Sequence, residues 1–427
     1  MPLRASTPCG HYPGKRTYFI HLLLSIPFPA FPREERVEMG YRYAVVGSGR
    51  QGTAAAYDFA KFGEAEEIVM ADVSLPQARR ASARVNKLLG RRVAHPVQAD
   101  VTKPSTILKA IRGADAMLSG VPYFFNLGLA KLAVRAGVSM VDFGGNTEVV
   151  RKELAMDKAA KKVGVGLIPD CGMGPGLNIT MSVYAMELLD VPEHVFVYDG
   201  GLPLDPKPPW NYELTFNVEG LTNEYHGDAT FIRGGKIVRV PLFTGFEVVD
   251  VPPLGKLEAI VTAGGLSTAP WSFLGKLTTY ENKTLRYPGH WAQMIAFNDL
   301  GLFELDPIDV DGKRVVPRHV FHALFEPKVL PEKIVDVCVE RVRALGQKDG
   351  AAAEAVVDLV DRYDPGTGFT SMERLTGWHA AIAAEMIAMG RIPPGAHPVE
   401  LGIPARPFVA EARKRGINIE ERVSPAA

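Results

Sequence analysis

Three glycines near the start of the first long apolar run have the spacing of a turn that holds phosphate. They stand in "VVGSGRQG", between that run and a segment of helical periodicity. Glycine permits a tight turn, lets a pyrophosphate approach the backbone and lets helix and strand pack closely. The N-terminus of the helix adds free N–H donors and a partial positive charge. The spacing therefore predicts a dinucleotide site. Its residues would be Gly47, Ser48, Gly49, Arg50, Gln51 and Gly52.

An acidic residue lies where the ribose of such a dinucleotide would be held. Asp72 ends the second apolar run, "EEIVMAD", 25 residues after Gly47. A carboxylate at this place accepts hydrogen bonds from two ribose hydroxyls and repels a 2′-phosphate, which favours NAD over NADP. We interpret Arg79, Arg80 and Arg84, which follow, as a solvated helix face. The alternative to the whole site is a glycine turn in an α/β domain that binds nothing.

The segments around these residues predict a parallel sheet. Apolar runs alternate with segments of helical periodicity up to about residue 168, joined by short loops. Such alternation is typical of doubly wound folds, in which ligands bind at the carboxyl ends of the strands. Residues after the third and fourth strands should therefore meet the glycine turn at one rim. We assign Asp100, Val101, Val121 and Pro122 to the cofactor, and Tyr123 and Asn126 to the pocket beside the nicotinamide.

A second glycine-rich stretch, "CGMGPG" at residues 171–176, directly follows the strand that ends at Asp170. Pro175 lacks a backbone donor, which argues against a second phosphate cradle. Glycine also allows close backbone approach and unusual dihedral angles. We predict that this turn leads out of the cofactor domain and lines the nicotinamide side of the site. A plain interdomain turn is the alternative.

Later segments predict a different architecture. From about residue 195 the chain shows short alternating segments with turn signals, which predict a mostly antiparallel sheet. Asp349 and Gly350 predict a hairpin within it. Thr370 and Glu373 predict a capping box at the start of a helix that stops at Gly390. The expected fold class is α/β, a Rossmann doubly wound parallel sheet plus an inserted α+β domain with a mostly antiparallel sheet.

Composition limits the partners. Lys plus Arg and Asp plus Glu each total 48, so no net charge draws the chain to nucleic acid or to an acidic membrane surface. The three cysteines, Cys9, Cys171 and Cys338, are widely spaced and indicate neither a disulfide framework nor a metal site. We therefore expect a cytoplasmic protein with a small neutral or zwitterionic substrate.

The first 38 residues need a separate interpretation. Basic residues precede a short apolar run there, which Pro27 and Pro29 interrupt. The run is too short to span a bilayer, and no small-residue cleavage site follows it. We expect residues 1–38 to be a disordered extension or the product of an upstream start, with a targeting segment as the alternative.

Several motifs taken together resemble one enzyme family. They are "VVGSGRQG", "VPYFFN", "VDFGGN", "IPDCGMGPGLN", "GGLPLDPKPPWNYELTFNVEGLTNEY" and "TLRYPGHW", and from about residue 41 onward the chain is similar to the lysine 6-dehydrogenases of the saccharopine-dehydrogenase-like superfamily. The resemblance implies NAD-dependent oxidative deamination of the side-chain amine of L-lysine, giving the 6-semialdehyde that cyclises to a piperideine carboxylate. It also implies a homodimer or higher homo-oligomer. The cofactor domain would comprise residues 39–168 and about 369–427, and the substrate domain residues 169–368.

That chemistry suggests roles for polar residues in the second half of the chain. An amine must be neutral before a hydride leaves its carbon, and each proton transfer needs a positioned acid or base. Arg286 is the candidate for the α-carboxylate of lysine, because its planar fork matches a carboxylate. His290 is the candidate proton carrier, with a hydrogen-bonded structural histidine as the alternative. Asp170 would hold an ammonium group or act as base, with a role in capping the following turn as the alternative.

Further candidates carry less specific signals. Lys207 lies in a loop stiffened by Pro206 and Pro208, where a catalytic lysine and a solvated one are both open. Tyr212 and Glu219 are additional polar candidates for the substrate pocket. Cys171 reads as a packing residue, since no covalent step is needed.

Two other functions remain open. A saccharopine or carboxyspermidine type dehydrogenase would use the same hydride chemistry on a secondary amine, and it would need a second arginine or lysine for a second carboxylate. A dinucleotide-sensing protein without turnover would keep the glycine turn alone.

Overall fold

The computed structural model describes residues 40–426, and its first sheet consists of seven parallel strands. The order is β17-β6-β5-β4-β1-β2-β3, so the direction of winding reverses between β1 and β4. A reversal of this kind leaves room for a ligand beyond the carboxyl ends of the strands. The strands are β1 (Tyr41–Val46), β2 (Ala65–Asp72), β3 (Ala94–Gln98), β4 (Ala116–Ser119), β5 (Ser139–Asp142), β6 (Gly166–Ile168) and β17 (Gly395–Ala396).

Helices cover both faces of this sheet, which confirms the predicted doubly wound fold. Alternate strand residues enter two separate apolar clusters, with Val45 and Leu118 in one and Val46 and Met117 in the other. The period of two follows from the alternation of side chains along a strand. The helical elements between the strands are α1 (Arg50–Lys61), α2 (Leu75–Leu89), α3 (Pro104–Ala110), η1 (Tyr123–Phe125), α4 (Asn126–Ala136), α5 (Thr147–Leu154) and α6 (Asp157–Val163).

The second sheet has nine strands and is mostly antiparallel, as predicted, with β12 and β7 as its parallel pair. Strands β15 and β16 are joined by the expected two-residue hairpin, in which Asp349 (φ 51°) and Gly350 (φ 77°) both have positive φ. The strands are β7 (Val191–Pro203), β8 (Asp228–Arg233), β9 (Lys236–Pro241), β10 (Glu247–Val251), β11 (Gly255–Ile260), β12 (Thr279–Arg286), β15 (Asp336–Lys348), β16 (Ala351–Arg362) and β18 (Ile419–Pro425).

Further helices and a small hairpin accompany the second sheet. Two of the helices begin at the two glycine-containing turns that follow β6 and β12. The elements are α7 (Leu177–Glu187), α8 (Val218–Asn223), α9 (Ala269–Ser272), α10 (His290–Asp299), β13 (Ile308–Val310), β14 (Lys313–Val315) and α11 (Pro317–Val329).

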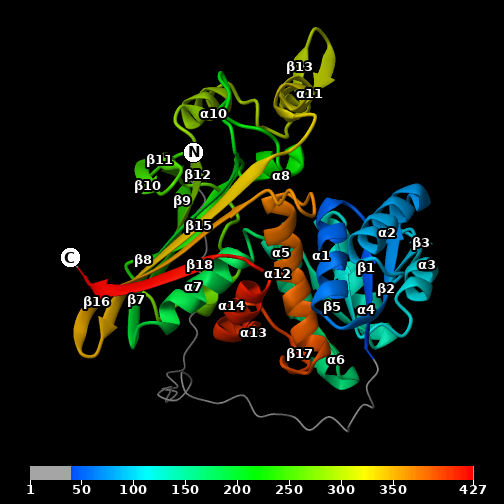
Figure 1. The fold of residues 1–427 in the computed structure, drawn as a ribbon. Coiled ribbons are helices and arrows are strands. Elements are labelled where there is room, and N and C mark those ends of the chain that lie inside the picture. Colours follow the sequence, from blue (N-terminus) through cyan, green and yellow to red (C-terminus); the bar gives the residue numbers. More distant parts are fainter. Residues whose placement is uncertain (1–39, 427) are drawn as a thin grey trace, which may run out of the picture. The chain divides into compact units, whose positions relative to one another are not determined.

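The C-terminal part of the chain serves both sheets. Helix α12 (Ser371–Ala388) begins with the predicted capping box of Thr370 and Glu373 and lies against α1 (Figure 1). It is followed by β17, by α13 (Val399–Gly402) and by α14 (Ala405–Lys414). The prediction placed all of residues 369–427 in the cofactor domain, whereas β18 pairs with β16 of the second sheet. Without β18, the backbone N–H and C=O groups along one edge of β16 would have no hydrogen-bond partners in the sheet. Strand β18 supplies these partners.

The prediction for residues 1–38 lies outside the described residues. Within residues 40–426, no helix is long and apolar enough to cross a membrane. In the same part of the chain, no cluster of three or more His, Cys, Asp or Glu side chains is arranged to hold a metal ion.

Candidate active site at the carboxyl ends of the parallel strands

The three glycines of the first turn differ in what surrounds them. Gly47 has a φ of 103°, and a Cβ there would lie 2.6 Å from the backbone of Gly120. A Cβ on Gly52 would lie 2.2 Å from the carbonyl oxygen of Gly47. Gly49 has no atom within 4 Å of its Cβ position, and as N-cap it leaves the first N–H groups of α1 without a side-chain partner. The turn therefore presents an open backbone and a helix N-terminus, which suit a diphosphate.

Asp72 lies beside this turn at the end of β2. Its carboxylate accepts the backbone N–H of Ser48 at 3.0 Å and that of Ser74 at 2.9 Å. An ionised carboxylate offers about four acceptor positions. Asp72 can therefore fix the glycine turn and still accept hydroxyl groups of a ribose.

The Asp100 carboxylate bonds to residues that follow it directly in the sequence. Its carboxylate accepts hydrogen bonds from the backbone and hydroxyl of Thr102 and pairs with Lys103 at 3.1 Å. These groups lower its pKa to about 2. Asp100 and its neighbour Val101 thus follow β3 at the predicted rim, with the Asp100 carboxylate turned toward the start of α3.

The loop after β4 lies next to the first turn and to the end of β5. A Cβ on Gly47 would lie 3.0 Å from the side chain of Val121. A Cβ on Gly145 would lie 3.3 Å from the side chain of Tyr123. Pro122 is exposed and leads into η1. Asn126 is buried, and its Oδ1 accepts the Ser119 hydroxyl at 2.7 Å, so this side chain anchors the loop.

The second glycine turn leads from β6 to α7 and contacts the second sheet. A Cβ on Gly176 (φ 137°) would lie 2.2 Å from the carbonyl oxygen of Gly172. A Cβ on Gly174 would lie 2.7 Å from Oδ2 of Asp199 on β7. Glycine is therefore required at these positions because backbone and second sheet approach closely.

Asp170 begins this turn with a φ of 64° and is buried. Burial, together with the negative charges of Asp142 and Glu400, raises its pKa to about 7, although the hydroxyl of Ser267 and the N–H of Gly145 oppose the shift. The Ser267 hydroxyl donates a hydrogen bond to the carboxylate. A carboxyl with a pKa near neutrality can exchange a proton at working pH.

Arg286 is buried at the end of β12. Its Nη2 lies 3.3 Å from Oε2 of Glu224, and its guanidinium lies 5.5 Å from the ring centre of Tyr212 and 5.7 Å from that of Trp291. Nε has no hydrogen-bond partner among residues 40–426. Burial raises the pKa of Glu224 to about 7 although Arg286 lowers it. Nη1 donates to the carbonyl oxygen of Leu285 at 2.9 Å, so Nε is the part of this guanidinium that remains without a partner among residues 40–426.

His290 lies next to Arg286 among aromatic side chains. Its Nε2 is 3.1 Å from the hydroxyl of Tyr225, and its ring centre is 5.0 Å from that of Tyr212. Burial and the positive charge of Arg286 hold its pKa well below the ordinary value. A neutral, fully enclosed imidazole favours the alternative of a hydrogen-bonded structural histidine over a proton carrier.

The two further candidates, Lys207 and Glu219, are exposed. Lys207 is exposed, and within the described part of the chain its amino group makes no hydrogen bond or ion pair. Glu219 lies 3.6 Å from Arg318 and 3.7 Å from His322 on α11. Arg318 is itself buried, and nothing in the sequence around "VVPRHVF" distinguished it.

Several contacts join the two sheets at this rim. Arg50, the first residue of α1, donates from Nη2 to the carbonyl oxygen of Thr215 at 3.2 Å. Arg84 lies 4.1 Å above the ring of Phe369 and donates to Gly368, so it is not the solvated residue that the sequence suggested. The start of α1 and the middle of α2 are therefore tied to the segments that follow β7 and β16.

Sequence reasoning missed two carboxylates on the second sheet. Asp199 accepts hydrogen bonds from the side-chain amides of Asn178 at 3.0 Å and Asn282 at 3.2 Å, and burial raises its pKa to about 6. Glu340 lies opposite Asp199 on β15 and is buried. A polar residue at an inward position of an apolar strand is the only signal that could have identified either one.

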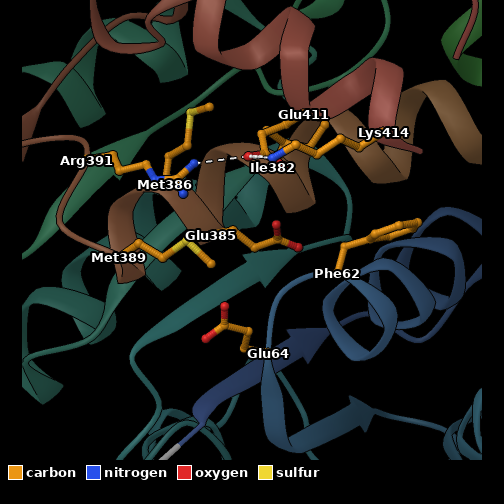
Figure 2. Close-up of a pocket in the computed structure, with 9 residues that line it drawn as sticks. All are labelled: Phe62, Glu64, Ile382, Glu385, Met386, Met389, Arg391, Glu411 and Lys414. Atoms are coloured by element: carbon orange, nitrogen blue, oxygen red, sulfur yellow. Dashed lines mark hydrogen bonds and ion pairs between the residues drawn. The ribbon is translucent and has the colours of Figure 1, made fainter. Parts of the chain in front are cut away.

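A hollow of about 190 Å³ lies at the other end of α1 from the glycine turn (Figure 2). None of the predicted site residues lines it. Arg415 pairs with Asp58 and Glu385 beside it, which ties α14 to α1 and α12. Its lining residues are Phe62, Glu64, Ile382, Glu385, Met386, Met389, Arg391, Glu411 and Lys414.

Family models match nearly all of the described chain. Residues 43–168 match the saccharopine dehydrogenase NADP binding domain, and residues 172–417 match the saccharopine dehydrogenase C-terminal domain. The saccharopine dehydrogenase (NADP(+), L-glutamate-forming) of Saccharomyces cerevisiae is 24% identical over 256 residues, which cover 57% of this chain and 56% of the relative. The enzyme of the same name from Pyricularia oryzae is 23% identical over 180 residues, 41% of this chain and 38% of the relative. The matched region thus spans about half, or less, of these relatives.

Solved structures share the fold. Apo saccharopine dehydrogenase (L-Glu forming) from Saccharomyces cerevisiae superposes with a TM-score of 0.72 at 20% identity, covering 90% of this chain and 100% of that one. Homospermidine synthase from Legionella pneumophila, in complex with NAD, gives a TM-score of 0.61 at 13% identity, covering 90% and 92%. Both likenesses concern the arrangement of the two sheets and their helices.

Proposed function

The chain belongs to the saccharopine dehydrogenase family of oxidoreductases, and from that premise we propose that it oxidises the side-chain amine of L-lysine with NAD. The product would be the 6-semialdehyde, which cyclises to a piperideine carboxylate. NAD, when bound, accepts the hydride from the carbon that bears the amine.

The observation that carries this proposal is the buried Arg286 with its unpartnered Nε. A guanidinium in this state binds the carboxylate of an amino acid with charge-assisted hydrogen bonds. It lies on the second sheet, and it is close enough to Asp199, which adjoins the second glycine turn, to lower the pKa of that residue. The substrate would therefore extend from Arg286 toward the carboxyl ends of the parallel strands.

Asp170 is the proposed base. Its pKa of about 7 lets it accept a proton from an ammonium group or from attacking water, and the Ser267 hydroxyl orients its carboxylate. Lys207 is too exposed, and His290 too enclosed, for this task.

The residues of the first turn fit a dinucleotide. Gly49 leaves the backbone open, α1 presents uncapped N–H groups, and Asp72 offers acceptors for ribose hydroxyls. The negative charge of Asp72 would repel a 2′-phosphate, which supports NAD. The matched domain and the curated relatives are named for NADP, so both cofactors belong in every assay.

A second candidate is a dehydrogenase acting on a secondary amine that carries another carboxylate. Arg318 favours it, because this arginine is buried, its Nη2 has no partner among residues 40–426, and its electrostatic neighbours include Tyr123 of the rim. Arg318 would hold the second carboxylate as Arg286 holds the first.

The test follows absorbance of reduced cofactor for the four combinations of NAD or NADP with L-lysine or saccharopine. Arg286→Lys keeps the charge and removes the fork, and it should raise the KM for lysine at least about tenfold while the Kd for NAD is unchanged. Arg318→Lys is the matched control, which should affect saccharopine alone. An unchanged KM for lysine in Arg286→Lys would exclude the assignment. No reduction with any combination would favour a dinucleotide-sensing protein.

A further inference from the structure

Two carboxyl groups face each other across adjacent strands of the second sheet. Asp199 on β7 and Glu340 on β15 are direct partners in the antiparallel register. Directly opposite residues point to the same face of a sheet, with Cβ atoms about 5 Å apart. This is the face that packs on α7, because Val197 and Val342, each two residues away on the same strands, lie in the core cluster that contains Ile179.

Glu340 has no partner for either oxygen within the described part of the chain, and its side chain is buried, with 1% of the residue exposed. Its neighbour Asp199 already accepts from Asn178 and Asn282. A buried carboxyl without a donor costs free energy, so such groups are usually paired or reserved for a ligand. The strands bury two acids here and supply no cation to Glu340.

Unpartnered polar atoms of other elements gather near the same place. Arg286 on β12, the next strand, lowers the pKa of Asp199, and its own Nε is unpaired among residues 40–426. The hydroxyl of Tyr212, which contacts Arg286 through its ring, is also buried without a partner in that part of the chain. A Cβ on Gly174 of the second turn would lie only 2.7 Å from Oδ2 of Asp199. Two acids on β7 and β15 thus lie on one side of this region and the guanidinium of Arg286 on the other, which is the charge arrangement that matches an amino-acid zwitterion.

We propose that Asp199 and Glu340 form a subsite for a primary ammonium group of the substrate. This proposal rests on the proposed function, in which an amino acid is anchored by Arg286. Lysine carries two ammonium groups, on Cα and on Cε, and either presents three N–H donors to the two carboxylates.

Glu340 changes protonation when the subsite is filled. Burial and the nearby charge of Asp199 raise the pKa of Glu340 well above its usual range, so in the empty site it keeps its proton. An arriving ammonium favours the carboxylate, and the proton of Glu340 then leaves to solvent while the ammonium keeps its own three. Asp199 faces Glu340 from β7, Leu359 faces it from β16, and Cys338 lies two residues away on its own strand.

The experiment measures ligand binding by calorimetry to the full chain saturated with NADH, which cannot accept a hydride from lysine. The ligands are L-lysine, 6-aminohexanoate, which lacks the α-ammonium, and norleucine, which lacks the side-chain ammonium. Glu340→Gln removes the charge and keeps the shape. Glu354→Gln is the matched control, because Glu354 lies on β16 and pairs with Arg343 far along the hairpin.

We expect Glu340→Gln to weaken lysine binding about ten- to a hundredfold, with NAD binding and the control unchanged. If the subsite binds the α-ammonium, 6-aminohexanoate should bind wild type and variant equally. If it binds the side-chain ammonium, norleucine should do so. Lysine binding should release about one proton in the wild type and none in Glu340→Gln, as measured in buffers of different ionisation heat. The unliganded variant should melt no lower than the wild type, since it loses an unpaired acid.

Equal lysine affinity in Glu340→Gln and wild type would overturn the subsite, as would a lower melting temperature with unchanged proton release. Reduction of NAD by lysine is followed in separate samples of the same proteins with oxidised cofactor. Turnover of lysine that is insensitive to Glu340 overturns the subsite alone, whereas binding that depends on Glu340 without any reduction overturns the proposed oxidation alone. Asp199→Asn gives a second variant on the other strand, and it should show the same loss of affinity.

Discussion

Asp72 fixes two backbone segments, and we propose that it also binds the cofactor. It accepts the N–H of Ser48 in the glycine turn and the N–H of Ser74 at the start of α2, and a ribose is the proposed partner of its remaining acceptor positions. Asp72→Asn keeps one acceptor oxygen and removes the charge. We expect this substitution to weaken NAD binding about tenfold or more and to reduce the ratio of the affinities for NAD and NADP. Titration of both cofactors, followed by nicotinamide or protein fluorescence, measures this; an unchanged ratio of the two affinities would refute the ribose assignment.

Single residues differed in how well the sequence identified them. Gly47 and Gly52 could be predicted because their spacing reflects a local backbone requirement that any such turn shares. Asp199 and Glu340 could not be predicted as a pair. They face each other only because of the register between two strands that lie more than a hundred residues apart in the sequence. Arg286 was identified by type, and its burial between Tyr212 and Trp291 was not foreseeable from spacing.

At the level of elements, α12 is positioned by a glycine. A Cβ on Gly377 would lie 2.7 Å from the carbonyl oxygen of Gln51 and 2.9 Å from the backbone nitrogen of Ala55, so α1 cannot yield without moving its backbone. Gly377→Ala should therefore destabilise the fold by about 1–3 kcal/mol. Gly128→Ala in α4 is the control, because nothing lies within 4 Å of its Cβ position, and it should stabilise by about 0.5–1 kcal/mol. Urea unfolding of both variants measures the difference, and equal effects would contradict the packing argument.

The elements themselves were largely predictable. The capping box of α12 and the hairpin between β15 and β16 carry local signals, and both are present. The destination of β18 was not predictable, because an exposed seven-residue strand can pair with either sheet until the free edge of β16 is known.

For the whole molecule, buried acids make stability depend on pH. Burial and the charges of Asp142 and Asp170 raise the pKa of Glu153 to about 10, and burial and the charge of Asp199 raise the pKa of Glu340 well above its usual range. A carboxyl with a raised folded pKa contributes stability that is complete below its unfolded pKa and is lost as the pH rises toward the folded value. The free energy of unfolding should therefore fall between pH 7 and pH 9, by about 1.4 kcal/mol per pH unit for Glu153.

Denaturant unfolding at pH 7, 8 and 9 measures that slope, and Glu153→Gln should make it shallower. A slope that is flat, or that rises with pH, would show that these carboxyls are ionised in the folded protein.

The central claim is that the rim of the parallel sheet brings a nicotinamide against an amine held by the second sheet. The most direct measurement uses L-lysine carrying deuterium at both positions of C6, with NAD and the full chain, and analyses the reduced cofactor by mass spectrometry. The account predicts one deuterium in each reduced nicotinamide and a slower reaction than with ordinary lysine. Reduced cofactor without deuterium, or a chain that binds both ligands and reduces nothing, would contradict it.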